Sequence, residues 1–322
     1  MQQHDDGLRG GTSRAVRLES FGGPEVLAVR DVPEPQAGDG QIRVRVTAAG
    51  LNPMDWFMTA DAETAARFGL SLPAGFGTDY AGVVDQVGAG AVGYAVGERV
   101  FGTALSRAVA DFVVVEANGN IASGVAHHTP DDVDDRTAAT LSIAGSTAAA
   151  ALAVLDLGPH DTVLVGGAGG GVGVFAVQLA RIAGARVLGT GSPSTAEHLR
   201  SLGAEPVAYG DGLVGRIRDL DAGPVTAALD LHGTDTVQVA RELGVPDGRI
   251  CTIAAVVDGV PAANGASAAP DALENIARLV AAGRLRVPIA ATFPVEDIRA
   301  AVELQAARHV RGKVVIDLRP KD

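Results

Sequence analysis

A single cysteine, Cys251, is present among the 322 residues, so neither an intramolecular disulfide nor a cysteine-rich metal cluster can form. The chain also lacks any apolar run approaching the roughly 18 residues that span a bilayer. Basic residues are few: the formal net charge is −12, which disfavours nucleic acid and anionic membranes as partners. The first thirteen residues are polar and glycine-rich and predict a loose tail, not a signal peptide. These absences predict a soluble, cytoplasmic protein.

The composition predicts a folded chain with two domains. Hydrophobic residues make up 47% of the sequence, enough for a sizeable core, and the length exceeds that of one ordinary domain. From residue 14 to about 116, short β-branched runs alternate with Gly, Pro and Asp, which is typical of a barrel or sandwich. Residues 55–70 are the exception, because their composition is helical and contains no strong breaker.

Later in the chain, strand patterns alternate with helix patterns. An Ala-rich stretch from Pro130 to Leu157 predicts a helix, and alternating strands and helices follow. The strands are continuous apolar runs, typical of a parallel sheet buried on both faces. We therefore predict an α/β fold with a β-rich domain at 14–136 and a doubly wound, Rossmann-type parallel sheet at 137–268. A terminal segment at 269–322 carries two amphipathic helices and a strand.

The strongest local signal is the glycine-rich turn after the first strand of the second domain. Ala168, Gly170 and Gly173 occupy the three fingerprint positions of a dinucleotide-binding turn, with Gly171 and Val172 between them. Small residues there permit the tight turn, the approach of a pyrophosphate and the packing of helix on strand. An isolated pattern of this kind could be a packing turn, but the flanking strand and helix favour dinucleotide binding.

The end of the next strand bears on which dinucleotide is bound. It contains Thr190, Gly191 and Ser192, where NAD-binding proteins usually carry Asp or Glu for the ribose 2′-hydroxyl. A carboxylate would repel a 2′-phosphate, so its absence favours NADP. Ser194 and Thr195 add hydroxyl donors, although an ordinary polar loop would have the same composition.

Stretches spread over nearly the whole chain together resemble a known superfamily. They are residues 21–27, 44–56, 77–88, 96–102, 168–173 and 311–318. They resemble the medium-chain dehydrogenase/reductase superfamily, specifically its zinc-free NADPH:quinone oxidoreductase (zeta-crystallin-like) and enone reductase branch. The resemblance implies a chaperonin-10-like barrel in the first domain, to which the terminal segment returns. It also implies an active site in the cleft between the two domains, and a homodimer.

The same resemblance implies that no metal is used. Zinc alcohol dehydrogenases have a cysteine where this chain has Asn52, and His-Glu where it has Thr78 and Asp79. They also carry four closely spaced cysteines for a structural zinc, which this chain lacks. Two soft or imidazole ligands are thus missing from the catalytic position.

Three residues are candidates for catalysis on this resemblance. Asn52 is expected to donate a hydrogen bond to the acceptor carbonyl, although an Asn before Pro53 could instead cap a loop. Asp55 could hold a donor or a water, or be a structural turn carboxylate. Tyr80 could donate a proton to an enolate, or lie buried in a strand with its hydroxyl bonded to the backbone.

Six further residues match positions that contact the cofactor in this family. Thr147 and the segment Ile253, Ala254 and Ala255 would pass the nicotinamide, Tyr209 would contact the adenosine end, and Lys313 would lie near the cofactor. Core packing or a solvated charge is the alternative for each. The loop at 192–195 departs from the family, because it offers hydroxyls where the family has a Lys or Arg.

The sequence therefore predicts hydride transfer from NADPH to a small molecule, a quinone or an α,β-unsaturated carbonyl, without zinc. Two alternatives stay open. One is a specialised biosynthetic enoyl reductase, and the other is an NADPH-binding protein without turnover.

Overall fold

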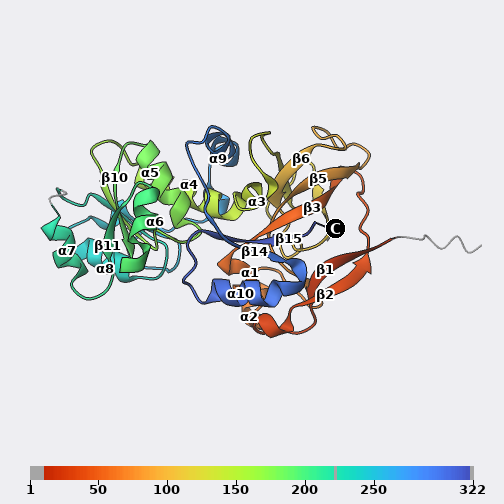
Figure 1. The fold of residues 1–322 in the computed structure, drawn as a ribbon, viewed down its shortest axis with the longest axis horizontal. Coiled ribbons are helices and arrows are strands. Elements are labelled where there is room, and N and C mark those ends of the chain that lie inside the picture. The colour runs from red at the N-terminus through yellow and green to blue at the C-terminus, as the bar shows by residue number, and fades with distance from the viewer. Residues whose placement is uncertain (1–10, 221–222, 320–322) are drawn as a thin grey trace, which may run out of the picture.

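The first domain is built from antiparallel strands joined by tight turns. The computed structural model of the protein describes residues 11–220 and 223–319 (Figure 1). The strands of this domain are β1 (Thr12–Leu18), β2 (Ala28–Pro33), β3 (Gln41–Leu51), β4 (Ala74–Gly75), β5 (Asp79–Val87), β6 (Arg99–Thr103), β7 (Phe112–Glu116) and β8 (Val125–His128), joined late in the chain by β14 (Ile289–Pro294) and β15 (Lys313–Asp317). They form a three-stranded sheet, β2-β1-β4, and a larger one, β14-β15-β3-β5-β6-β8, in which β7 also pairs with β3.

The helices of this domain are short and lie around its sheets. They are α1 (Pro53–Phe57), α2 (Ala62–Arg67), α3 (Asp135–Ala138) and α10 (Ile298–Ala306), with the 3₁₀ turns η1 (Pro24–Val26) and η5 (Val295–Asp297). The strands alternate buried and more exposed residues, as in β3, where Ile42, Val44 and Val46 are buried and Arg45 is exposed. The buried set forms one apolar core to which α10 contributes Ile298.

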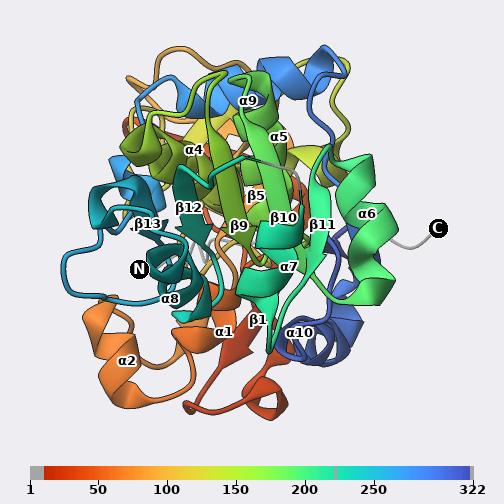
Figure 2. The same ribbon diagram turned by 90° about the vertical axis from the view of Figure 1, so that its left-hand side faces the viewer.

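The second domain contains one parallel sheet. Its strands are β9 (Thr162–Gly166), β10 (Arg186–Gly191), β11 (Glu205–Ala208), β12 (Ala227–Asp230) and β13 (Ile250–Thr252), in the order β11-β10-β9-β12-β13 (Figure 2). Its helices are α4 (Ser142–Leu155), α5 (Gly173–Ile182), α6 (Ala196–Ser201), α7 (Leu213–Asp219), α8 (Asp235–Glu242) and α9 (Ala272–Ala281), with the turns η2 (Pro193–Thr195), η3 (Asp247–Arg249) and η4 (Gly265–Ser267). The predicted mixed α/β fold with a parallel doubly wound sheet is confirmed.

Both faces of the parallel sheet are covered, which explains its continuous apolar strands. In β9, Val163 and Val165 belong to the core beneath α4 and α5, while Leu164 belongs to the core beneath α7 and α8. Because successive strand residues point to opposite faces, one apolar run supplies both cores.

The outer edge of β13 is partly occupied by the chain itself. Thr252 donates its N–H to the Pro261 carbonyl at 3.0 Å, and Ala263 donates to the Thr252 carbonyl at 3.0 Å. A parallel bridge thereby joins Thr252 and Ala262. We call residues 261–263 the edge-capping segment. These two hydrogen bonds pair it with β13, but it does not form a sixth strand.

The carboxyl-terminal segment connects the two domains. Helix α9 packs on α4, whereas β14, α10 and β15 lie with the first domain, where β15 pairs with β3 (Figure 1). Between them, Gly312 donates its N–H to the Gly169 carbonyl in the glycine-rich turn at 2.9 Å. The segment is therefore shared between the domains.

At the amino-terminal end, the predicted loose tail is only partly tested. Thr12 and Ser13 belong to β1 and pair with β2, so the prediction is wrong for these two residues. Residues 1–10 lie outside the described residues. Among residues 11–220 and 223–319, no helix is both long and apolar enough to cross a membrane.

Candidate functional site

A buried polar cluster forms where three strands of the first domain meet. Asn52 follows β3, Asp79 begins β5 and Lys313 begins β15. The antiparallel register places Gly50 opposite Asp79 and Leu51 opposite Val314, so the end of β3 lies beside the starts of the other two strands. Asn52, Asp79 and Lys313, although distant in sequence, therefore lie together at one end of these three neighbouring strands.

The side chain of Asn52 lies at the centre of this cluster. Its Oδ1 accepts a hydrogen bond from Lys313 Nζ at 2.5 Å, and its Nδ2 donates to Asp79 Oδ2 at 2.9 Å. Lys313 Nζ also donates to the Leu51 carbonyl at 3.0 Å, and Asp79 Oδ1 accepts from the Ile143 N–H in the first turn of α4 at 3.1 Å. The cluster thus links the first domain to α4 of the second.

Asp55 supports Asn52 from the backbone side. It is the third residue of α1, where its Oδ2 accepts from the Asn52 N–H at 2.8 Å and its Oδ1 accepts from Thr78 Oγ1 at 2.7 Å. A carboxylate at this helix position satisfies an N–H that the helix leaves without a partner. Asp55 therefore fixes the backbone from which the Asn52 side chain projects.

Burial sets the charge state of the cluster. Asn52, Asp79 and Lys313 are 3%, 0% and 2% exposed. Burial raises the pKa of Asp79 to about 7 and that of Asp55 to about 6, and it lowers the pKa of Lys313, while the attraction between the lysine and the two carboxyls opposes each shift. One positive and two acidic groups therefore share a site with little water.

Asp79→Asn is expected to gain stability relative to the unaltered chain as the pH rises from 5 to 8. The pKa of Asp79 is about 7 in the fold against an ordinary value of 3.8, so the folded chain keeps a proton there that the unfolded chain releases. The carboxyl's contribution to stability is full below about pH 4 and is lost as the pH rises through 7. An amide does not titrate, so the difference in melting temperature should move toward the variant by about 5 °C.

Circular dichroism melts at several pH values measure this difference. Asp131→Asn, an exposed carboxyl in the same domain, is the matched control and should track the unaltered chain much more closely. A difference for Asp79→Asn that stays constant from pH 5 to pH 8 would contradict a raised pKa.

The glycine-rich turn is held against this cluster by the carboxyl-terminal segment. A Cβ added to Gly171 would lie 3.3 Å from Lys313 Cδ, so the lysine stem runs along the turn on its way to Asn52. At Gly173 a Cβ would lie 2.4 Å from the Gly167 carbonyl oxygen, which explains why only glycine allows this packing of helix on strand. Buried Ala168 fills the first position of the turn.

The turn presents free backbone donors at the start of α5. Gly170 donates its N–H to the Gly167 carbonyl at 3.0 Å, which closes the turn. In the described residues, the N–H groups of Gly171, Val172 and Gly173 have no hydrogen-bond acceptor. Together with the positive end of the α5 dipole, these donors suit an anion such as a pyrophosphate.

Beside this turn, the end of β10 forms a polar loop with an arginine. Thr190 is buried and Gly191 is half-buried. Ser192 Oγ and Ser194 Oγ lie 2.9 Å apart, and Arg311 Nη2 donates to Ser194 Oγ at 3.1 Å. The guanidinium supplies the cation that the loop sequence lacks.

Two aromatic residues border the same loop. Tyr209 is 61% exposed, and its N–H donates to the Gly191 carbonyl at 3.3 Å. The His198 ring lies against Gly169, where an added Cβ would be 3.4 Å from its Cδ2. Burial lowers the pKa of His198, and the nearby guanidinium of Arg311 lowers it further. Tyr209 therefore contacts the loop through its backbone and keeps its side chain exposed, whereas His198 contacts the glycine-rich turn.

The residues predicted to pass the nicotinamide directly follow β13 or lie on α4. Ile253 donates its N–H to the carbonyl of Asp230 at 3.1 Å, and Thr252 Oγ1 accepts from the N–H groups of Ala254 and Ala255. Thr147 is buried on α4, one turn beyond the Ile143 amide that contacts Asp79, and its hydroxyl donates to the Ile143 carbonyl at 2.7 Å. Helix α4, which carries Thr147, also contacts β13, but the Thr147 hydroxyl is bonded to its own helix.

Tyr80 does not join the cluster. It is fully buried in the core of the first domain, and its hydroxyl donates to the Val125 carbonyl at 3.0 Å. Because adjacent strand residues point to opposite faces, Tyr80 points away from the face on which Asp79 lies. Burial also raises the pKa of this hydroxyl far above its usual range. The geometry does not support a role as proton donor.

Sequence reasoning missed two residues of this region. Asp79 was considered only as a position without a zinc ligand, although an acidic residue at the start of a buried strand was a usable signal. Arg311 lies 117 residues from Ser194, and no local pattern connects them.

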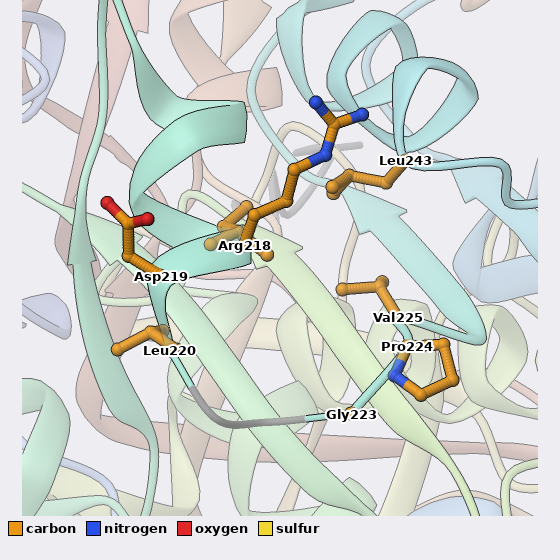
Figure 3. Close-up of a pocket in the computed structure, with 8 residues that line it drawn as sticks. Arg218, Asp219, Leu220, Gly223, Pro224, Val225 and Leu243 are labelled. Carbon is orange, nitrogen blue, oxygen red and sulfur yellow. The ribbon is translucent and has the colours of Figure 1, made fainter.

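Two further observations concern the surroundings. Among the described residues, no group of three or more His, Cys, Asp or Glu side chains is placed to hold a metal ion. A surface cavity lies between Asp219, Gly223 and Leu243, where α7 and α8 end and β12 begins (Figure 3). The cavity therefore lies at the amino ends of the strands, whereas the glycine-rich turn follows the carboxyl end of β9. Ligands of open α/β sheets bind at the carboxyl ends of the strands.

The chain is similar to known proteins over both domains. A family model described as "Alcohol dehydrogenase GroES-like domain" matches residues 38–135, and one described as "Zinc-binding dehydrogenase" matches 202–316. The quinone oxidoreductase of Pseudomonas aeruginosa is 29% identical over 333 residues, covering 94% of this chain and 99% of that protein. The solved quinone oxidoreductase from Coxiella burnetii has a TM-score of 0.83 and 27% identity, covering 96% of this chain and 100% of that one. Phthioceranic/hydroxyphthioceranic acid synthase of Mycobacterium tuberculosis is 30% identical over 321 residues, covering 91% of this chain but 14% of that protein.

Proposed function

Because this chain belongs to the medium-chain dehydrogenase/reductase superfamily, in its quinone oxidoreductase branch, we propose that it transfers hydride from NADPH to a quinone or an α,β-unsaturated carbonyl without zinc. The observation that carries the proposal is the contact between the glycine-rich turn and the polar cluster. The Lys313 stem runs along Gly171, and its ammonium holds Asn52. An amide suited to a carbonyl oxygen therefore lies beside a turn suited to a dinucleotide.

The residues present fit a bound dinucleotide. Free N–H groups of Gly171, Val172 and Gly173 would hold the pyrophosphate, and Tyr209 would lie at the adenosine end. Ser194 and Arg311 favour NADPH over NADH, because a hydroxyl and a guanidinium suit a 2′-phosphate. Thr147 and Ile253–Ala255 would border the nicotinamide.

The donor set does not fit zinc. Around Asn52 it consists of an amide, the Thr78 hydroxyl and two carboxylates, without the thiolate or imidazole that zinc prefers. The ammonium of Lys313 already lies 2.5 Å from Asn52 Oδ1, and a second cation there would be repelled. We therefore propose that a protein donor polarises the acceptor.

The chemistry requires little from the protein beyond binding and orientation. When bound, NADPH would supply a hydride, and the acceptor would also gain one proton from solvent, giving a hydroquinone or a saturated carbonyl. Asn52 would donate a hydrogen bond to the carbonyl oxygen, on which negative charge develops. The buried setting of Asn52 would keep water from competing for that bond.

A specialised biosynthetic enoyl reductase is the second candidate. A biosynthetic role is favoured by the 30% identity with the mycobacterial acid synthase, although this chain spans 14% of that protein's length. An enoyl reductase activity is favoured by the fold shared with the solved CurK enoyl reductase, at a TM-score of 0.83 and 24% identity. Cytoplasmic location and a homodimer stay predictions. If the chain pairs through β13, the partner has to displace or extend the edge-capping segment, in which Pro261 has no N–H to donate.

Titration with NADPH and NADH, followed by an acceptor, tests the proposed function. Absorbance at 340 nm should fall only when 1,4-benzoquinone or 2-cyclohexen-1-one is added to the NADPH complex. Binding without turnover on either acceptor would favour a specialised enoyl substrate or a binding role. Tighter binding of NADH would contradict the role given to Ser194 and Arg311.

A further inference from the structure

The carboxamide of Asn52 bridges the ammonium of Lys313 and the carboxyl group of Asp79, which carry opposite charges once the pH exceeds the Asp79 pKa of about 7. Its oxygen accepts from the Lys313 ammonium at 2.5 Å, and its nitrogen donates to the Asp79 carboxylate at 2.9 Å. All three side chains are buried, so these charge-assisted bonds act in a medium of low polarity. The amide therefore lies within a local field directed from the lysine to the aspartate.

This field allows one orientation of the amide. A rotation of half a turn about the last side-chain bond would place the NH₂ group against the ammonium and the oxygen against the carboxylate. Two charge-assisted hydrogen bonds would become two repulsive contacts. An isolated asparagine at a loop start would exchange between both orientations, whereas Asn52 is held in one.

The fixed orientation leaves one donor unused. A carboxamide nitrogen carries two hydrogens, and Asp79 accepts one of them. Within the described ranges, the second hydrogen has no acceptor. Because the lysine withdraws electron density from the amide oxygen, the remaining N–H is a stronger donor than that of a free asparagine.

Both orienting groups are themselves anchored to the second domain. Asp79 accepts from the Ile143 N–H at the start of α4, and Lys313 follows Gly312, whose N–H donates to Gly169 in the glycine-rich turn. The orientation of Asn52 is therefore tied to the parts that would hold the nicotinamide and the pyrophosphate.

We propose that Asp79 and Lys313 are positioning residues that hold the Asn52 carboxamide in one orientation and direct its second N–H to the carbonyl oxygen of the acceptor. This inference rests on the proposed function, because it names how that site recognises its acceptor. Asn52 touches the acceptor, whereas Asp79 and Lys313 act through Asn52.

A double-mutant cycle on turnover tests whether the lysine acts through Asn52. Lys313→Met keeps the apolar stem, removes the charge, and should lower kcat about tenfold by itself. In an Asn52→Ala background the same substitution should change kcat by less than about twofold, because the group it positions is already absent. Equal effects in both backgrounds would overturn the proposal. Arg136→Met, which removes an exposed cation of the same domain, is the control and should leave kcat unchanged.

A second measurement needs no turnover and reports on the amide directly. In ¹⁵N-labelled protein saturated with NADP⁺, the two Nδ2 protons of Asn52, assigned by their loss in Asn52→Ala, should be widely separated, since one is bonded to Asp79. Adding 2-cyclohexen-1-one should shift the other. In Asp79→Asn and Lys313→Met the separation should shrink. An Asn52 signal unmoved by the enone in folded protein that binds NADP⁺ would overturn the proposal.

The two measurements separate this inference from the proposed function. If the amide signal responds to the enone while neither acceptor is reduced, the reductase function fails and the positioning of Asn52 stands. If turnover occurs and the amide signal does not respond, the function stands and the positioning proposal fails.

Discussion

Replacing Asn52 with alanine is expected to lower kcat for quinone or enone reduction by about 100-fold, because removal of one preorganised donor to a developing oxyanion has an effect of this size. NADPH binding should change much less, since the free N–H groups of Gly171, Val172 and Gly173 are untouched. Steady-state kinetics at saturating NADPH, together with a fluorescence titration of the cofactor, measure both quantities.

Asn120→Ala is the matched control for this substitution. It removes an exposed carboxamide of the same domain that, in the part of the chain that the structure describes, bonds only to nearby backbone N–H groups, and it should leave kcat unchanged. The Asn52 variant also deprives Lys313 and Asp79 of a partner, so its fold has to be verified by circular dichroism. A folded Asn52→Ala enzyme with unaltered kcat would exclude Asn52 as the donor.

Replacing Arg311 with alanine is expected to remove most of the proposed preference for NADPH over NADH. A charge-assisted hydrogen bond contributes about 1.5–3 kcal/mol, so the Kd for NADPH should rise by about 10- to 100-fold. The Kd for NADH should stay the same, because NADH has no 2′-phosphate to face the guanidinium. Titration of both cofactors by fluorescence gives the ratio.

Arg284→Ala supplies the comparison for the loss of a positive charge. Arg284 is exposed and belongs to the same carboxyl-terminal segment, but no hydrogen bond joins its side chain to the loop at 192–195 within the described residues. Its removal should weaken NADPH binding less than threefold, as expected for a distant screened charge. If both substitutions weaken the binding of NADPH and of NADH to the same extent, Arg311 does not recognise the 2′-phosphate.

The parallel sheet was predictable because its signals are local. The strand, glycine-rich turn and helix that became β9 and α5 follow one another without a gap, and each apolar run matched a strand buried on both faces. Helix boundaries were less predictable. The helix expected from Pro130 to Leu157 divides into α3 and α4 near Thr140, whose hydroxyl bonds back to the Thr137 carbonyl.

Other elements depend on partners far away in the chain. Strand β14 is half-exposed and has no clear strand pattern, and it exists because β15 pairs with it. Residues 55–70 were expected to be helical and contain two short helices, since Asp61 accepts from the Thr64 N–H and starts α2 anew. Local composition predicts helix there but does not reveal the break.

The candidate site divides in the same way. The glycine-rich turn could be located from sequence alone, and Asn52, Asp55 and Lys313 came from the family resemblance. That Lys313 bonds to Asn52 across 261 residues could not be predicted, because it depends on the pairing of β15 with β3. The same applies to Arg311, which reaches the loop after β10 only through the path of the carboxyl-terminal segment.

The position of Lys313 also has a consequence for biosynthesis. A ribosome makes Asp55 and Asp79 more than 230 residues before Lys313, the lysine whose charge attracts them. Before residue 313 is made, β15 is also missing from its place beside β3. The carboxyl groups of Asp55 and Asp79 are then either hydrated or protonated. The nascent first domain therefore has every residue of strands β1 to β8 but still lacks the strand and the lysine that cover Asn52 and Asp79. The polar cluster around Asn52 can therefore form only after the carboxyl-terminal segment with β15 has been made.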